Sequence, residues 1–114
     1  MKRILVAEDN DSNYLLVTVI LRGKYDIERA NHGKEAVEKM QTGTYDYVLM
    51  DIRMPIMDGL EATKHIREFN SFTPIIAVSA YAFESDKRNA MQSGFNNYLE
   101  KPIDKKRLLS LLEE

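Results

Sequence analysis

Short runs of consecutive apolar residues alternate along the whole chain with longer segments in which apolar residues recur every three or four positions. Runs of the first kind are typical of strands buried on both faces, and the second spacing is typical of helices with one buried face. The pattern therefore predicts five strands that alternate with five helices. We expect strands at 4–7, 26–30, 47–50, 74–78 and 97–99, and helices at 14–21, 33–42, 60–69, 84–93 and 105–112.

The helical spacing also predicts which side chains face the core and where some helices begin and end. The first helix is expected to bury one face through four apolar residues, Leu15, Leu16, Val19 and Ile20. Either Asp11 or Ser12 should cap its N-terminus, because short polar side chains can accept from the free backbone N–H groups there. Gly43 should end the second helix and Gly94 the fourth.

The alternation of strands and helices favours an α/β fold with a doubly wound parallel sheet. Parallel neighbours need crossover connections, and the helices of those connections cover both faces of the sheet. The runs 4–7 and 47–50 fit such strands because they are continuously apolar rather than alternating. In open sheets of this kind, ligands bind beyond the carboxyl ends of the strands. Functional residues are therefore expected at those ends.

Composition and charge narrow the class of protein without identifying it. The chain has 114 residues, 44% of them hydrophobic, and we interpret residues 1–114 as one globular domain. Its 16 basic and 18 acidic residues give a net charge of −2, which predicts no direct binding to nucleic acid. Without cysteine, disulfides and thiolate metal sites are excluded. The lack of cysteine makes a cytoplasmic location the default expectation, and the first apolar run is too short for a membrane span.

Polar side chains follow the predicted strands at the points where they end. They are Glu8 and Asp9 after the first strand, Asp51 after the third, Ser79 after the fourth, and Glu100 and Lys101 after the fifth. These residues would converge on one edge of the sheet. Carboxylates crowded at one place repel each other unless a proton or a cation is present. Oxygen ligands without His or Cys suit a hard cation, and Mg²⁺ is the typical ion that also takes phosphate oxygens and water.

Four segments carry these polar residues, namely the acid pair Glu8 and Asp9, "MDIRMPIMDG" around Asp51, "VSAYA" with Ser79, and "YLEKP" with Lys101. In this order they resemble the response-regulator receiver domain of two-component signalling. The resemblance covers essentially the whole chain and implies a flavodoxin-like (βα)5 fold with strand order 2-1-3-4-5. It is strongest to receivers attached to hybrid sensor histidine kinases. It implies either a stand-alone receiver or a domain of a longer protein.

The resemblance implies a phosphorylation switch that depends on Mg²⁺. Asp51 would accept a phosphoryl group from a phosphohistidine on a histidine kinase or a histidine phosphotransfer domain. Glu8, Asp9 and Asp51, with the backbone carbonyl of Arg53, would hold the metal. Such a domain catalyses its own phosphorylation and dephosphorylation and is a signalling switch rather than a turnover enzyme. It is expected to make no direct contact with a membrane, and phosphorylation could produce a homodimer.

Three further residues take roles that the same resemblance implies. Lys101 would pair with a phosphoryl oxygen, and Ser79 would donate a hydrogen bond to another. Tyr98 would be the aromatic side chain that swings inward when Ser79 moves. The Lys101-Pro102 peptide bond is expected to be cis, which would aim Lys101 at the acids. Arg53 and Tyr81, each two residues beyond a site residue, are candidates for shielding the acyl phosphate from water.

Several polar residues have simpler interpretations. Asp58, with Glu61 three positions later, is expected to cap the third helix rather than to bind metal, and Gly59 to relieve backbone strain beside it. Asn10 and Asp11 are interpreted as loop residues, and the histidines His32 and His65 as surface residues.

Three other functions compete with that of a phosphorylated receiver. A haloacid-dehalogenase-type phosphatase would need a second Asp where this chain has Arg53. A nucleotide or flavin binder would need a Gly-rich loop after the first strand, where "AEDNDSN" carries acids. The third alternative is a degenerate receiver that binds proteins without being phosphorylated, and the complete residue set argues against it.

Overall fold

The computed structural model describes residues 1–81 and 83–113, and within them five strands and five helices alternate as predicted. The strands are β1 (Arg3–Ala7), β2 (Asp26–Ala30), β3 (Tyr47–Asp51), β4 (Ile75–Ser79) and β5 (Asn97–Glu100). The helices are α1 (Asp11–Leu21), α2 (Gly33–Thr42), α3 (Gly59–Phe69), α4 (Glu84–Ser93) and α5 (Lys105–Leu112).

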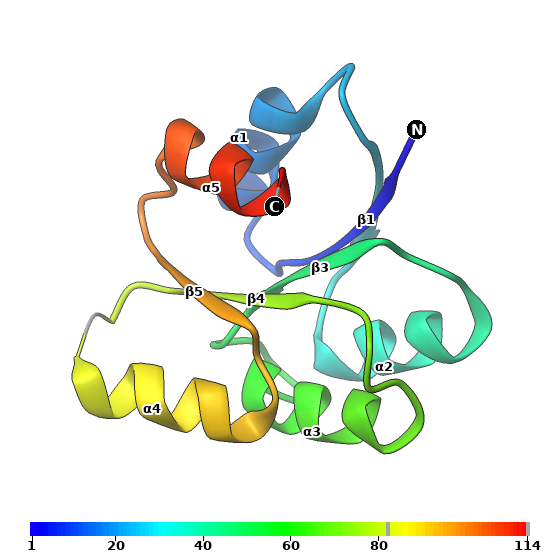
Figure 1. Cartoon of the computed structure of the whole chain (residues 1–114), viewed down its shortest axis with the longest axis vertical. Helices are drawn as coiled ribbons and strands as arrows, with labels where there is room; N and C mark the ends of the chain where they lie inside the picture. Colours follow the sequence, from blue (N-terminus) through cyan, green and yellow to red (C-terminus); the bar gives the residue numbers. More distant parts are fainter. Residues whose placement is uncertain (82, 114) are drawn as a thin grey trace.

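The strands form one parallel sheet in the order β2-β1-β3-β4-β5. Helices α1 and α5 cover one face of the sheet, and α2, α3 and α4 cover the other (Figure 1). The predicted doubly wound, flavodoxin-like α/β fold is therefore confirmed. The order of strands reverses between β1 and β3, so the carboxyl ends of these two strands border the position where ligands bind in such sheets.

Each face of the sheet has its own apolar core. The core on the side of α2, α3 and α4 includes Leu5, Val48, Met50, Ile66 and Ile75. The core on the side of α1 and α5 includes Ile4, Val6, Leu49, Ile76 and Leu108. Successive residues of the central strands point into opposite cores. This arrangement explains why the runs on β1 and β3 are continuously apolar.

The buried face of α1 differs from the one predicted. Among the four residues expected in the core, only Ile20 is buried, together with Val17 and Leu21. The other three are exposed by 59%, 39% and 57%, namely Leu15, Leu16 and Val19. Seven of the eight residues from 14 to 21 are aromatic or aliphatic, so their spacing fits more than one face. The position of the helix against the sheet selects the face that is buried.

The helix ends agree with the sequence pattern except at α1. Its cap is Asn10, whose Oδ1 accepts a hydrogen bond from the Asn13 N–H at 3.0 Å, rather than Asp11 or Ser12. Gly94 ends α4 with φ of 112°, a left-handed conformation that glycine adopts without a steric penalty. Gly43 ends α2 in an extended conformation, so its role there does not depend on a positive φ.

The strands of the central sheet extend to the polar residues that follow the apolar runs. Asp51 is the last residue of β3 and pairs with Val78, and Ser79 is the last residue of β4 and pairs with Glu100 of β5. Beyond Asp51, the Ile52 N–H still donates to the Val78 carbonyl at 3.0 Å. The backbone under both polar side chains is therefore held by the sheet rather than by a free loop. Among the described residues, none of the helices is long and apolar enough to cross a membrane.

Candidate functional site

Three carboxylates meet where β1 and β3 end. Glu8 follows β1 directly, and the pairing of Ala7 with Met50 brings it beside Asp51. Asp9 follows in the loop before α1. Oxygen atoms of the three carboxylates lie within 4.8 Å of one another. Glu8 and Asp51 are each only 4% exposed, whereas Asp9 is exposed. The structure thus brings together the three acids that the sequence placed at strand ends.

Lys101 lies between the two buried acids. Its Nζ is 2.9 Å from Oδ2 of Asp51 and 3.2 Å from Oε1 of Glu8. The Lys101 N–H donates to the Ser79 carbonyl at 2.8 Å, which holds the backbone of Lys101 against the end of β4. The Lys101-Pro102 peptide bond is cis, as predicted. Because β5 is two strands from β3, a side chain at its end must be long to reach Asp51.

The donor atoms at this site fit a hard divalent cation. Three carboxylates face one ammonium group, so the cluster keeps an excess of negative charge when all the acids are ionised. The site contains oxygen ligands and no imidazole, and the exposed Asp9 leaves a side open for water or phosphate oxygens. The Arg53 N–H lies 3.4 Å from Oδ1 of Asp51, and the role of its carbonyl as a metal ligand stays a prediction.

Burial and Asp51 together shift the ionisation of Glu8. Burial raises the pKa of Glu8, the hydrogen bond and charge of Asp51 raise it further, and the result is about 7 instead of 4.5 despite the opposing charge of Lys101. For Lys101, burial lowers the pKa, but the hydrogen bonds and charges of Asp51 and Glu8 outweigh burial and raise the pKa overall. Glu8 therefore titrates near neutral pH in the metal-free cluster, and a bound cation would displace its proton.

We predict that affinity for Mg²⁺ falls about tenfold between about pH 8 and about pH 6, because Glu8 must lose its proton to bind metal. Since the folded-state pKa of Glu8 lies above its ordinary 4.5, the metal-free protein should lose stability as pH rises from about 4.5 to about 7. Mg²⁺ should restore that stability above about pH 7. Calorimetric titration with Mg²⁺ at about pH 8 and about pH 6 measures the affinity and the number of protons released. Equal affinity at both, with no proton release, would contradict the raised pKa.

A second group of polar contacts surrounds Ser79. The Tyr81 N–H donates to the Ser79 Oγ at 3.1 Å, and the Tyr98 hydroxyl donates to the Tyr81 carbonyl. The guanidinium of Arg53 stacks over the Tyr81 ring, with 4.6 Å from Cζ to the ring centroid. All four residues line one hollow beside the acids. Hydrogen bonds thus link Ser79 to Tyr98 through Tyr81, and the sequence did not predict these bonds.

Asp58 and Gly59 serve the start of α3. The Oδ1 of Asp58 accepts from the Glu61 N–H at 2.8 Å, which confirms the predicted cap. Gly59 does not have a positive φ, so the predicted relief of backbone strain is not its role. A Cβ on Gly59 would lie 2.3 Å from the Asp51 carbonyl oxygen. Glycine is required there because the start of α3 packs against the backbone of Asp51.

One histidine has a structural role that the sequence interpretation missed. His32 is partly buried and caps α2, where its Nδ1 accepts from the Glu35 N–H at 3.1 Å. The sequence signal for this cap was the position of His32 directly before Gly33, with Glu35 three residues after the histidine. His65 is exposed, as predicted, and lies 3.1 Å from Glu68.

Comparisons with known proteins agree with this geometry. The chain is 41% identical over 97% of its length to hybrid signal transduction histidine kinase I of Dictyostelium discoideum. It is 38% identical over 96% of its length to the sensor protein GacS of Pseudomonas syringae pv. syringae. The chain spans 7% and 13% of the lengths of these two relatives.

Among solved structures, the chain is similar to the receiver domain of a sensor histidine kinase from Pseudomonas aeruginosa with a magnesium ion coordinated in its active site cleft. The TM-score is 0.91 and the identity 36%, over 98% of this chain and 94% of that one. The family model described as "Response regulator receiver domain" matches residues 4–113. The chain therefore belongs to the response regulator receiver domain family.

Proposed function

We propose that this chain is a phosphoacceptor receiver domain of a two-component phosphorelay, in which Asp51 takes a phosphoryl group from phosphohistidine. The observation that carries the proposal is the buried Asp51 carboxylate, held at a rigid strand end by Lys101 and flanked by two further acids. A nucleophile fixed in this way needs little reorganisation before attack. The donor would be a histidine kinase or a histidine phosphotransfer domain.

In the proposed reaction an Asp51 oxygen forms a bond to phosphorus while the bond between phosphorus and the imidazole nitrogen of the donor breaks. For this step the second nitrogen of the donor imidazole carries a proton, so the ring leaves as neutral imidazole and needs no further proton. Lys101 Nζ, 2.9 Å from Asp51, keeps a positive charge beside the transferred group. Mg²⁺ held by Glu8, Asp9 and Asp51, with the Arg53 carbonyl, would neutralise charge on the phosphoryl oxygens.

The switch would start at Ser79. Its hydroxyl oxygen now accepts from the Tyr81 N–H, and its own proton is free to turn toward a phosphoryl oxygen on Asp51. A Ser79 that moves toward Asp51 would release the Tyr81 backbone, whose carbonyl accepts from Tyr98. Tyr98 could then turn inward. Phosphorylation of one aspartate would in this way change the surface formed by α4, β5 and α5.

One experiment distinguishes the phosphorylation switch from the competing proposal, a degenerate receiver that only binds proteins. The chain is titrated with beryllofluoride and Mg²⁺, and amide resonances of Ser79, Tyr81 and Tyr98 are followed by NMR. We expect all three to shift at saturation, because the phosphate mimic on Asp51 would attract the Ser79 hydroxyl. Resonances that stay unchanged under saturating mimic would support the binding module and contradict the switch.

The setting of the domain follows from the same proposal. The similarity to parts of hybrid kinases suggests a place within such a relay, and the donor chemistry suggests the cytoplasm, where kinases that use ATP make phosphohistidine. We propose no direct contact with nucleic acid or membrane, and a homodimer that forms only on phosphorylation. The domain is proposed to comprise residues 1–114.

The stacked pair of Arg53 and Tyr81 is expected to slow hydrolysis of the phosphorylated form by limiting the approach of water. Replacing either residue by Ala should speed dephosphorylation roughly twofold to fivefold, as expected for losing a cation–π contact at an exposed site. The double variant should be no faster than the faster single variant, because either change breaks the same stack. Loss of the phosphoryl group is timed by intact mass.

The exposed Arg88 on α4 provides the matched control for this experiment. Arg88→Ala removes a guanidinium without touching the stack and should dephosphorylate at the parent rate. Single variants at Arg53 and Tyr81 that keep the parent rate would reject the shielding role. Fully additive effects in the double variant would show that the two side chains act independently.

A further inference from the structure

We propose that Arg29 is a positioning residue for the metal site, because it fixes the loop that carries Glu8 and Asp9. The inference rests on the proposed function, since it concerns the Mg²⁺ site of the receiver. Arg29 lies on β2, the edge strand, and none of its contacts is to the reacting carboxylate of Asp51.

The guanidinium of Arg29 contacts three groups around the β1–α1 loop. Its Nε donates to the backbone carbonyl of Glu8 at 3.1 Å, and its Nη1 lies 2.9 Å from Oδ1 of Asp11. Its Cζ lies 4.5 Å from the centroid of the Tyr14 ring. The Arg29 side chain is 22% exposed. One planar cation thus joins β2, the loop after β1 and the first turn of α1.

The backbone of Glu8 is consequently held by β2 through both of its polar groups. The Glu8 N–H donates to the Ala30 carbonyl at 3.0 Å, while the Glu8 carbonyl accepts from Arg29. The Asn10 N–H donates in turn to Oε2 of Glu8 at 3.3 Å. The backbone of Glu8 is therefore fixed, and Asp9 follows it directly. Outer contacts that orient metal ligands typically change affinity about tenfold or more when they are removed.

Charge and geometry make opposite predictions for Arg29. The positive charge of Arg29 repels a cation, so its removal should strengthen Mg²⁺ binding if charge alone matters. If positioning dominates, removal should weaken binding, and a lysine should not restore it. A lysine keeps the charge but lacks the flat fork that donates to Glu8 and stacks on Tyr14 together. The two effects are therefore separable by substitution.

The experiment measures the Mg²⁺ dissociation constant of the parent chain, Arg29→Met and Arg29→Lys by NMR titration, with the amide resonance of Asn10 as a report on the loop. We expect both variants to bind Mg²⁺ about tenfold more weakly, and the Asn10 resonance to shift before metal is added. Asp11→Asn removes the ion pair but leaves the bond to the Glu8 carbonyl, so its dissociation constant should change less than about twofold.

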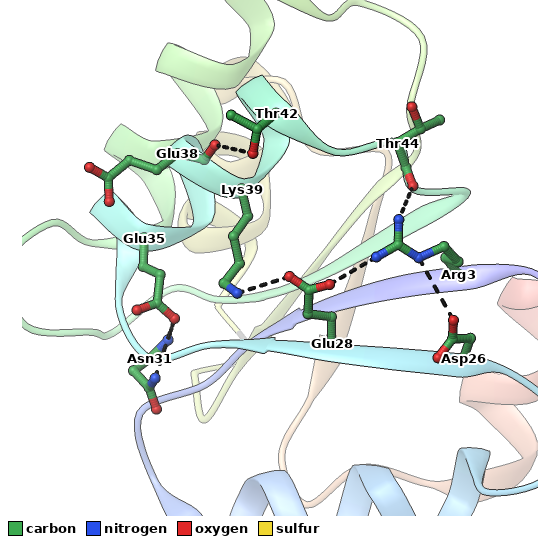
Figure 2. A network of polar contacts seen from close by, with 9 residues as sticks. All are labelled: Arg3, Asp26, Glu28, Asn31, Glu35, Glu38, Lys39, Thr42 and Thr44. Atoms are coloured by element: carbon green, nitrogen blue, oxygen red, sulfur yellow. Dashed lines mark hydrogen bonds and ion pairs between the residues drawn. The ribbon is translucent and has the colours of Figure 1, made fainter.

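Glu28→Gln is the matched control on the neighbouring residue of β2. Figure 2 shows its carboxylate held by Arg3 and Lys39, each at 2.8 Å, in a network that does not include Arg29. Thermal denaturation of all variants separates loss of stability from loss of affinity. We expect Glu28→Gln to lower stability and to keep the parent Mg²⁺ affinity, since adjacent strand residues face opposite sides of the sheet.

The possible outcomes distinguish this inference from the proposed function. If the parent chain binds Mg²⁺ and Arg29→Met binds as tightly or more tightly, the positioning role is overturned while the proposed function stands. If Arg29→Lys binds like the parent, the planar guanidinium is not required at this position, and the inference is again overturned. Equal weakening by Glu28→Gln would assign the effect to stability. A parent chain without Mg²⁺ affinity would overturn both proposals.

Discussion

Replacing Asp51 by Asn should abolish phosphorylation of the chain, because the side-chain amide lacks the ionised oxygen that would attack phosphorus. The change also removes one of the three carboxylates that meet at the ends of β1 and β3. Intact mass after incubation with Mg²⁺ and acetyl phosphate, or with a phosphorylated histidine donor, should show one added phosphoryl group on the parent and none on the variant. This is the largest effect we expect from any single substitution.

Asp58→Asn is the matched control, since it changes an aspartate of the same segment that caps α3. Asn caps helices about as well as Asp, so this variant should fold and accept phosphate like the parent. Asp51→Asn that is still modified, with the group located on another residue, would contradict the assignment. A parent chain that is never modified, under conditions in which Mg²⁺ binds, would support the degenerate alternative.

Arg67→Met should destabilise the fold by about 3 kcal/mol, because the guanidinium of Arg67 joins the end of α3 to two loops. Its Nε donates to the Gly94 carbonyl at 2.9 Å, and its Nη1 to the carbonyls of Asn70 and Thr73 at 3.2 and 2.8 Å. Its Nη2 donates to Oδ1 of Asn96 at 2.8 Å. Partial burial lowers the pKa of Arg67, and its removal would leave several acceptors without a donor.

Thermal and urea denaturation measure this loss, which corresponds to a fall in Tm of roughly 10 °C. The exposed Arg107 on α5 gives the matched control, and Arg107→Met should change the free energy of unfolding by less than about 0.5 kcal/mol. Arg67→Lys should lie between the two, since an ammonium group satisfies fewer of the same acceptors. An Arg67→Met variant as stable as the parent would show that water replaces the lost donors.

The sequence predicted the architecture because the local pattern of apolar residues shows whether an element is buried on one side or on both. Continuous apolar runs require strands covered on both sides, and their alternation with helices requires crossover connections. It did not predict the buried face of α1, where apolar residues occupy nearly the whole circumference and leave Leu15 and Val19 exposed. Which face is buried depends on where the helix lies against the sheet, and no local pattern contains that information.

For the site, residue type and position at a strand end were enough to bring Glu8, Asp9 and Asp51 together, because parallel strands end at one edge. The same rule placed Lys101 near them. The pKa of Glu8, the bonds that link Ser79 to Tyr98, and the contact of Arg29 with the Glu8 carbonyl were decided only by the tertiary structure. Such features depend on distances of a few ångströms between residues remote in the chain. A sequence pattern specifies which residues approach one another, and only packing sets those distances.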